Sequence, residues 1–320
     1  MIDFFEYNTT PIPVDEIANL FKDSFNQEMN SSYWEWRFLN NPVSKDVFIV
    51  YAKENGVLAA YYAVSPVAIV DLNGGSHTIA LSNMTMTHPN YQGKGLFKAL
   101  ANKMFDLLKS KGFIGVYGFA NSNSHYGFRN SLGWKDISAL NLFCLKNEDV
   151  KSTWFKNNLG LTFEIDEMIN ADLRITENFC RVQNKISAVF NSQVYQWRFI
   201  QIPNKTYKFI QAYTKNEVIG HLVFKEFGTQ IDVMEYWYLE NPEIDKDNLL
   251  IHIINRLNST YSGGINFWSN LHSSEHLILE KFGFKETEFN SYFGFIPFTD
   301  QPEFTQLENW HYRFTDSDIF

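Results

Sequence analysis

The sequence predicts a mixed α+β protein built from two tandem copies of one domain. A Trp-Arg-Phe motif recurs 161 positions apart, and segments with strand and helix periodicity alternate within each copy. A glycine-led helix also joins two predicted strands in the first copy. We therefore expect each copy to hold a central mixed, mostly antiparallel sheet flanked by helices.

The duplication extends well beyond this motif. Residues 36–38 match 197–199, and 57–58 match 218–219, at one unchanged spacing. Further along, Gly133-Trp134-Lys135 matches Gly283-Phe284-Lys285 at a spacing of 150 positions, so the second copy lacks 11 residues. The sequence predicts domains at 1–150 and 160–300, followed by a C-terminal tail at 301–320.

The elements of the first copy follow from periodicity and from breakers. Apolar residues at helical spacing predict a helix over 14–25, and Ser31 and Ser32 are candidate caps of a second helix ending near Phe38. Turn signals at 53–56 and 73–75 separate predicted strands, which are 47–52, 57–64, 67–72 and 77–87. A helix over 95–110 that ends before Gly112, a strand over 113–119, a short helix over 122–131 and a strand over 134–145 complete the copy.

The crossover through the helix at 95–110 implies one parallel strand pair in an otherwise antiparallel sheet.

Composition restricts the kinds of partner. The 320 residues include 30 Phe, and aromatic side chains make up 17% of the chain, which fits either a packed core or an apolar ligand groove. A net charge of −9 argues against a nucleic-acid partner, because binding to phosphates needs clustered Lys and Arg. No apolar run approaches the roughly 20 residues that span a bilayer, which argues against a membrane partner.

Two further features indicate the compartment. The N-terminal segment carries acids where a signal peptide has lysines. The two cysteines, Cys144 and Cys180, do not form a close-spaced pair, so we expect neither a metal site nor a disulfide framework. These observations predict a cytoplasmic protein without a metal.

The segment from Thr87 to Phe97 has the pattern of an anion-binding turn. A predicted strand runs into a tight turn whose glycines open a helix. Unpaired amides at a helix N-terminus, together with the helix dipole, attract negative charge. Gly93 and Gly95 have no Cβ, so a phosphate oxygen can approach the main chain there. A plain strand-to-helix turn fits as well, and the spacing matches neither the Walker loop nor the dinucleotide fingerprint.

Residues 92–97, Gln-Gly-Lys-Gly-Leu-Phe, resemble the Q/R-x-x-G-x-G/A pyrophosphate loop of the GNAT N-acetyltransferases. Gln92 stands at the Q/R position, Gly95 at the first glycine, and Phe97 where most members have Gly or Ala. The order of predicted elements is also similar to the fold of that family. The resemblance covers 1–150 and, through the duplication, most of 160–300.

The resemblance implies that acetyl-CoA is the co-substrate. Main-chain amides of the loop would hold its pyrophosphate, from Gln92, Gly93, Lys94, Gly95, Leu96 and Phe97. The strand residues Met84, Thr85 and Met86 would pair with the pantetheine arm, and Asn121 would hydrogen-bond to it. Asn123 is an alternative to Asn121, and capping of the helix over 122–131 is an alternative role for both.

The catalytic groups are less clearly marked. Members of the family often have a Tyr four residues before the Gly-aromatic pair, acting as the acid to the leaving thiolate. That position is Arg129 in this chain, and Tyr126 lies one helical turn earlier, so Tyr126 is our candidate for the acid, with a packed aromatic as the alternative. Arg129 is a candidate for contact with the CoA phosphates or for an exposed position. Candidates for the general base are His88, His125, Glu35, the terminal carboxylate of Phe320 and a water-relayed group.

The second copy is expected to have lost the cofactor site. Residues 242–247, Pro-Glu-Ile-Asp-Lys-Asp, replace the glycine loop, and acids at a helix N-terminus cap it themselves and repel a pyrophosphate. This copy would instead frame the acceptor pocket with Glu235 and Trp237. Because the Trp-Arg-Phe motif is kept in both copies, we expect it to serve the fold.

Together these features predict an acetyl-CoA-dependent N-acetyltransferase that acts on a small-molecule amine. Analogy with tandem members of the family points to an amino sugar or nucleotide sugar as acceptor. Two alternatives remain, a non-catalytic acyl-CoA sensor and an aminoacyl-tRNA-dependent ligase with a double GNAT fold, and the acidic charge speaks against the second. The sequence leaves the oligomeric state open.

Overall fold

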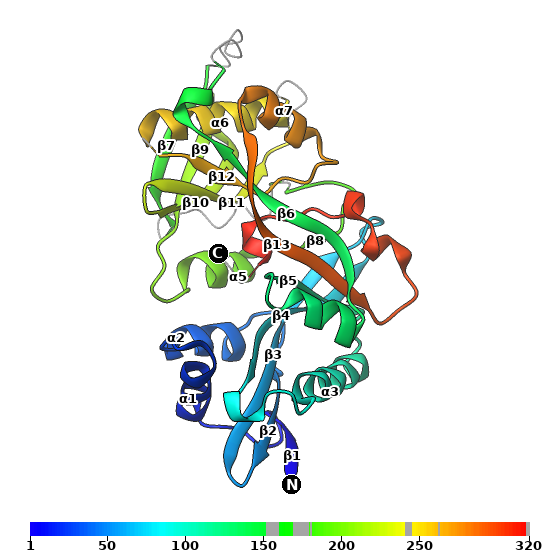
Figure 1. Ribbon diagram of the computed structural model, residues 1–320. Helices are drawn as coiled ribbons and strands as arrows, with labels where there is room; N and C mark the ends of the chain where they lie inside the picture. Colours follow the sequence, from blue (N-terminus) through cyan, green and yellow to red (C-terminus); the bar gives the residue numbers. More distant parts are fainter. Residues whose placement is uncertain (152–159, 169–178, 180, 241–244, 262, 318–320) are drawn as a thin grey trace.

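One continuous sheet runs through both halves of the protein. The computed structural model describes residues 1–151, 160–168, 179, 181–240, 245–261 and 263–317 (Figure 1). Its 13-stranded sheet has the order β1-β2-β3-β4-β5-β13-β6-β12-β11-β10-β9-β7, and β8 pairs with β3. The predicted α+β class is confirmed.

The first half contains the predicted alternation of strands and helices. Its elements are β1 (Ile2–Glu6), α1 (Val14–Phe25), α2 (Ser31–Trp34), β2 (Phe48–Glu54), β3 (Val57–Val70), β4 (Ser76–Thr87), α3 (Leu96–Ser110), β5 (Gly115–Ala120) and β6 (Lys135–Leu145). Two π-helical turns, η1 (Glu35–Leu39) and η3 (Gly127–Ser131), and two 3-10 turns, η2 (Pro89–Tyr91) and η4 (Asn147–Asp149), complete it.

The second half repeats much of this order. They are β7 (Thr162–Glu167), β8 (Ser187–Ala188), α5 (Ser192–Tyr195), the π-turn η7 (Gln196–Ile200), β9 (Lys208–Thr214), β10 (Glu217–Phe227), β11 (Gln230–Tyr238), α6 (Lys246–Thr260), β12 (Ile265–Phe267), α7 (Ser274–Phe282) and β13 (Lys285–Pro297). The C-terminal segment adds the 3-10 turns η8 (Pro302–Thr305), η9 (Leu307–Asn309) and η10 (Phe314–Asp316).

The two halves exchange their last strands. The second half's β13 pairs antiparallel with β5, with Phe293 opposite Phe119. The first half's β6 pairs with β12, with Cys144 opposite Asn266, and β6 and β13 also pair with each other. In Figure 1 this two-strand ribbon crosses from one half to the other. Each half therefore completes the sheet of the other.

Two expectations for the first half were wrong. The strands predicted at 57–64 and 67–72 are one strand, β3, which passes through Pro66. The missing N–H of Pro66 is tolerated because β2 has already ended, its last pair being Phe48 with Val64. The cap of α2 is Asn30, whose side chain accepts the amide of Tyr33 at 3.0 Å, and not Ser31 or Ser32.

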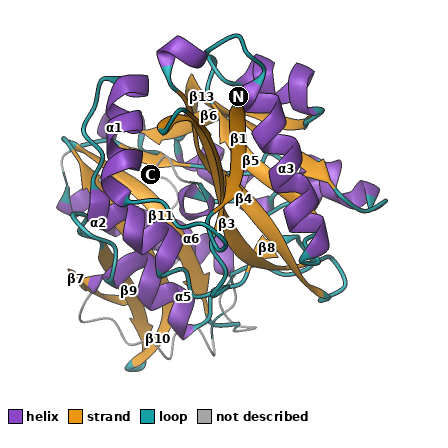
Figure 2. Ribbon diagram, turned by 90° about the horizontal axis from the view of Figure 1, so that it is seen from below, coloured by secondary structure: helices purple, strands orange, loops and turns teal. Residues whose placement is uncertain are grey.

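Helices cover both faces of the first half's strands, with α1 and α2 on one side and α3 on the other (Figure 2). Leu96, Leu100, Met104 and Leu108 of α3 are buried at helical spacing against one face. Ile17 and Leu20 of α1 pack on the opposite face. Gly112 follows α3 with φ of 81°, as expected of a helix-ending glycine.

The repeated tryptophans join the halves as a pseudo-symmetric pair. Trp36 Nε1 donates to the carbonyl of Trp197 at 2.8 Å, and Trp197 Nε1 donates to the carbonyl of Trp36 at 3.0 Å. Their rings stack with centroids 4.5 Å apart. The expectation that these tryptophans serve the fold is confirmed, because the same residue makes the same bond from each side.

The aromatic residues form a core shared by both halves. It contains Trp36, Tyr117 and Phe119 from the first half and Trp197, Trp237 and Trp268 from the second. The C-terminal segment contributes Phe304, Trp310, Tyr312 and Phe314 to the same cluster. Much of the high aromatic content thus fills the junction between the halves.

A buried histidine in the second half makes stability depend on pH. His221 is fully buried, and Gln211 Nε2 donates to its Nδ1 at 3.2 Å, so its Nε2 carries the proton toward Tyr195 Oη at 2.6 Å. Burial lowers the pKa of His221 to about 3.

We expect the free energy of unfolding to fall as the pH drops from about 6.5 toward 3. The unfolded chain takes up the proton in this window and the folded chain does not, so His221 alone accounts for roughly 4–5 kcal/mol over the whole window. Urea unfolding from pH 7 to pH 4 measures this, and His221→Asn should have a flatter profile. Equal slopes for the two proteins would contradict the assignment.

Within the described residues, every helix is too short or too polar to cross a membrane. In the same residues, no three His, Cys, Asp or Glu side chains gather as a metal site would require. Cys144 is buried with a free thiol, and Cys180 lies outside the described residues.

Candidate functional site

A cavity of about 380 Å³ opens where β4 ends and α3 begins. We call it the donor cavity. Its walls come from the end of β4, the loop before α3 and the turn after β5. They are Thr85, Met86, Thr87, Tyr91, Gln92, Gly93, Gly95, Leu96, Phe97, Asn123, Ser124, Gly127 and Phe128.

The glycines set the shape of the loop. Gly93 and Gly95 have φ of 76° and 77°, a left-handed conformation that side chains disfavour. A Cβ built on either would meet no atom within 4 Å, so the space above the main chain is open. The sequence therefore places its two loop glycines where the backbone needs them and where a ligand can approach.

The helix N-terminus offers free donors. Gly95 is the N-cap of α3, no side chain caps the helix, and its first turn has no acid. In the part of the chain that the structure describes, the amides of Leu96, Phe97 and Lys98 have no acceptor. These amides and the helix dipole together form an anion site. The loop therefore fits a diphosphate.

The comparisons with known proteins agree with this geometry. Residues 8–137 match the family model of the acetyltransferase (GNAT) domain. The first half of the chain is a GNAT domain. No curated protein has a sequence that matches the chain.

Solved structures extend the GNAT fold to both halves. A conserved protein of unknown function from Enterococcus faecalis V583 superposes with a TM-score of 0.67 at 14% identity, covering 93% of this chain and 72% of its own. A GCN5-related N-acetyltransferase from Anabaena variabilis gives 0.66 at 12%, covering 92% and 72%. A tandem GNAT protein from the clavulanic acid biosynthesis pathway gives 0.60 at 11%, covering 94% and 100%. These likenesses show a tandem GNAT fold.

Most of the predicted cofactor residues lie together. Seven of them line the donor cavity, namely Thr85, Met86, Gln92, Gly93, Gly95, Leu96 and Phe97. Two others do not line it. Met84 packs with the α1 side of the sheet, and Lys94 places its Nζ 4.4 Å from the ring centroid of Tyr91. The ring of Phe97 meets Phe128 edge-on at 5.5 Å, so the bulky residue at this GNAT position packs against the cavity's far wall.

Asn121 shapes the turn beside the donor cavity. Its Oδ1 accepts the amides of Asn123 and Ser124, both at 3.0 Å. This is the capping role weighed from the sequence, and it is Asn123 and Ser124 that line the cavity. Contact of Asn121 with pantetheine stays a prediction, for which its amide nitrogen is the remaining donor.

The candidate acid and its neighbours lie on the exposed side of the following turn. Tyr126 is 74% exposed and is not part of the cavity wall. Asp136 binds both neighbours, His125 Nε2 at 2.9 Å and Arg129 Nη1 at 2.9 Å, and Tyr292 of the exchanged strand stacks on His125. Asp136 and Tyr292 were not predicted, because they come from strands that the sequence did not place beside this turn.

The other candidate bases are dispersed. His88 Nδ1 accepts the amide of Asn90, and His88 Nε2 lies 3.6 Å from Asp23. Glu35 is exposed in η1, and Phe320 lies outside the described residues. The described part of the tail does enter the junction, where Tyr117 Oη donates to the carbonyl of Asp316 at 3.0 Å.

In the second half, the C-terminal segment of the chain occupies the place where the two central strands part. Strands β11 and β12 of this half pair through Asp232 with Asn266 and then part, as β4 and β5 part after Leu81 and Tyr117. The C-terminal segment bonds to both edges of this gap: Thr315 Oγ1 donates to the carbonyl of Met234, and Arg313 Nη1 donates to that of Trp268. In the second half, residues of the C-terminal segment therefore bond to the edges of both strands where they part.

The helix N-terminus of this half is also closed to anions. Asp245 Oδ1 accepts the amides of Asp247 and Asn248 at 3.0 and 2.9 Å, as expected of acids in that position. Residues 241–244 of the replaced loop lie outside the described residues. Glu235, predicted to frame an acceptor pocket, is fully buried and binds Arg181 Nε at 2.6 Å.

Proposed function

We propose that the protein transfers an acetyl group from acetyl-CoA to the amine of a small acceptor, as a cytoplasmic enzyme. One observation carries the proposal: the donor cavity ends on a helix N-terminus whose amides are free and whose glycines leave room for a diphosphate. Acetyl-CoA would supply the activated acetyl thioester.

The residues of the first half have defined parts in this proposal. Main-chain amides of 93–97 would hold the pyrophosphate, and the edge of β4 at Thr85 would pair with the pantetheine arm. Thr85 Oγ1 and both side-chain polar atoms of Asn83 are buried without a hydrogen-bond partner among the described residues, which supports a polar ligand beside this stretch. Holding donor and acceptor together would contribute to the rate enhancement.

Binding and turnover test the proposal separately. Acetyl-CoA should raise the melting temperature in a saturable way, and desulfo-analogues that keep the diphosphate should do the same. A thiol-release assay over a panel of amino sugars, amino acids and polyamines should then find at least one acceptor. If acetyl-CoA does not bind, the proposal fails at its first step.

We propose Tyr126 as the acid that protonates the leaving thiolate. It directly precedes Gly127 of the cavity wall. The proposal requires the exposed side chain of Tyr126 to turn toward the donor cavity. Tyr126→Phe should lower kcat by about 100-fold or more, with the affinity for acetyl-CoA unchanged. An unchanged kcat would remove Tyr126 from the mechanism.

A non-catalytic acyl-CoA sensor is the second candidate, favoured by the outward direction of Tyr126. This reading predicts saturable acetyl-CoA binding without thiol release for any amine. The two assays above separate it from the enzyme.

A further inference from the structure

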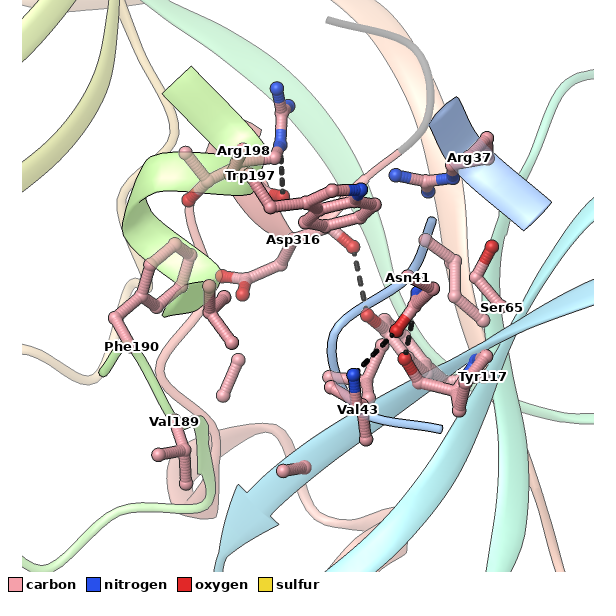
Figure 3. A pocket seen from close by; sticks show the side chains of 17 residues that line it. Arg37, Asn41, Val43, Ser65, Tyr117, Val189, Phe190, Trp197, Arg198 and Asp316 are labelled. Atoms are coloured by element: carbon pink, nitrogen blue, oxygen red, sulfur yellow. Dashed lines mark hydrogen bonds between the residues drawn. The ribbon is translucent and has the colours of Figure 1, made fainter. Parts of the chain in front are cut away.

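A second, smaller cavity lies at the junction of the two halves (Figure 3). We call it the junction cavity. Its volume is about 50 Å³, several times the roughly 10–15 Å³ that one water needs. Arg37, Ser65 and Tyr117 line it from the first half, Trp197 and Arg198 from the second, and Asp316 from the C-terminal segment.

Arg37 is a buried cation without a hydrogen-bond partner for two of its nitrogens. It is 4% exposed, and its Nε and Nη2 have no acceptor among the described residues. Ser65, 1% exposed, has an unpaired hydroxyl in the same cavity. The guanidinium lies 5.7 and 5.8 Å from the rings of Trp36 and Trp197, which offer it no acceptor. Burying such a group is costly unless an anion compensates it.

The second copy provides an internal comparison. Arg198 is the equivalent of Arg37, and its guanidinium is bonded: Nη1 donates to Tyr207 Oη at 2.9 Å and Nε to the carbonyl of Thr315 at 3.4 Å. The residue of the first copy in the place of Tyr207 is Asp46, which binds Lys111 Nζ at 2.7 Å instead. The fold can therefore satisfy this arginine from within, and in the first half it does not.

The nearby carboxylate is already engaged. Asp316 Oδ2 accepts Arg181 Nη2 at 2.6 Å and the amide of Arg313 at 2.8 Å. Asp316 therefore does not compensate Arg37, whose positive charge at the junction cavity a small anion would balance.

The junction cavity also lies close to where chemistry would occur. Leu81 and Tyr117, both in its wall, are the last paired residues of β4 and β5 before these strands part. Thr85 of the donor cavity is four residues further along the same strand. An acceptor anchored at Arg37 would extend along β4 toward the thioester end of the donor.

We propose that the junction cavity binds a carboxylate group of the acceptor, held by Arg37 and Ser65, so that the acceptor is a carboxylate-bearing amine. A carboxylate matches the flat donor face of a guanidinium. A cavity of this size takes a carboxylate with a short stem. The proposal rests on the acetyltransferase function for its acceptor part, and the binding part stands without it.

Acetate and the neutral acetamide serve as probes of binding in chloride-free buffer. Acetate should raise the melting temperature saturably, and acetamide should not. In Arg37→Met the effect of acetate should disappear, while the melting temperature without acetate should stay level or rise, because an uncompensated buried charge is gone. Arg37→Lys and Ser65→Ala should weaken acetate about tenfold. Lys109→Gln, which removes an exposed cation elsewhere, is the matched control.

Turnover tests the acceptor part. The amines are tested in pairs, in which one member has a carboxylate and the other a carboxamide in its place. Arg37→Met should lower kcat/KM for the carboxylate member by at least about tenfold. The kcat/KM for the carboxamide member and the KM for acetyl-CoA should stay unchanged. If Arg37→Met has an equally lowered melting temperature with and without acetate, Arg37 is purely structural and the proposal is overturned. Acetate binding that persists in Arg37→Met would also overturn it. If acetate binds but the enzyme does not prefer carboxylate-bearing amines, the junction cavity is an anion site and its role in binding the acceptor is refuted. Failure of every amine with intact acetate binding would instead refute the acetyltransferase.

Discussion

Gly95→Glu is expected to lower the affinity for acetyl-CoA by at least about 100-fold. The substitution puts a carboxylate above the free amides of α3, where it satisfies them and repels a diphosphate. The loss corresponds to about 3 kcal/mol of binding free energy. The fold should lose only about 1 kcal/mol, since φ of 77° strains a side chain but no atom stands within 4 Å.

The matched control is Gly74→Glu. Gly74 has φ of 81° and equally open space, in the turn between β3 and β4. It should therefore carry the same strain and the same charge without any effect on acetyl-CoA. Calorimetric titration of both variants measures the difference. Retained affinity in Gly95→Glu would refute the donor cavity as the cofactor site.

The parts of the fold that depend on local signals were predictable. Gly93 and Gly95 identify the anion-binding turn because the backbone conformation itself demands glycine there. The spacing of Leu96, Leu100 and Met104 fixes the buried face of α3 for a similarly local reason. The repeat of Trp36 at Trp197 predicted a structural role for these tryptophans, and each of them makes the same bond to the other.

The features that depend on long-range pairing were not predictable. Nothing in β6 or β13 marks an exchange of strands, because either strand pairs equally well within its own half or across the junction. The stacking of Tyr292 on His125 could therefore not be predicted from the sequence. The difference between Arg37 and Arg198 was hidden for the same reason, because part of what satisfies Arg198 is a carbonyl of the C-terminal segment.

Arg181→Met is expected to lower the free energy of unfolding by about 3–5 kcal/mol at neutral pH. Arg181 joins the second half to the C-terminal segment, with Nε bonded to Glu235 Oε2 and Nη2 to Asp316 Oδ2, both at 2.6 Å. Its removal leaves two carboxylates, each almost fully buried, without their shared cation. The exposed pair of Lys208 and Glu226 provides the control, and Lys208→Met should cost less than about 1 kcal/mol.

The loss in free energy of unfolding caused by Arg181→Met should become smaller as the pH falls. Burial and the neighbouring Glu235 already raise the pKa of Asp316, and Arg181 is the main group that opposes this rise, together with the amide of Arg313. Without Arg181 the pKa rises further, so the folded variant binds a proton that the unfolded chain releases, and lowering the pH favours the folded state. The added changes Glu235→Gln and Asp316→Asn should recover part of the stability at neutral pH. If the loss of stability is independent of pH and persists in the variant that carries all three changes, Arg181 acts through packing and not through charge.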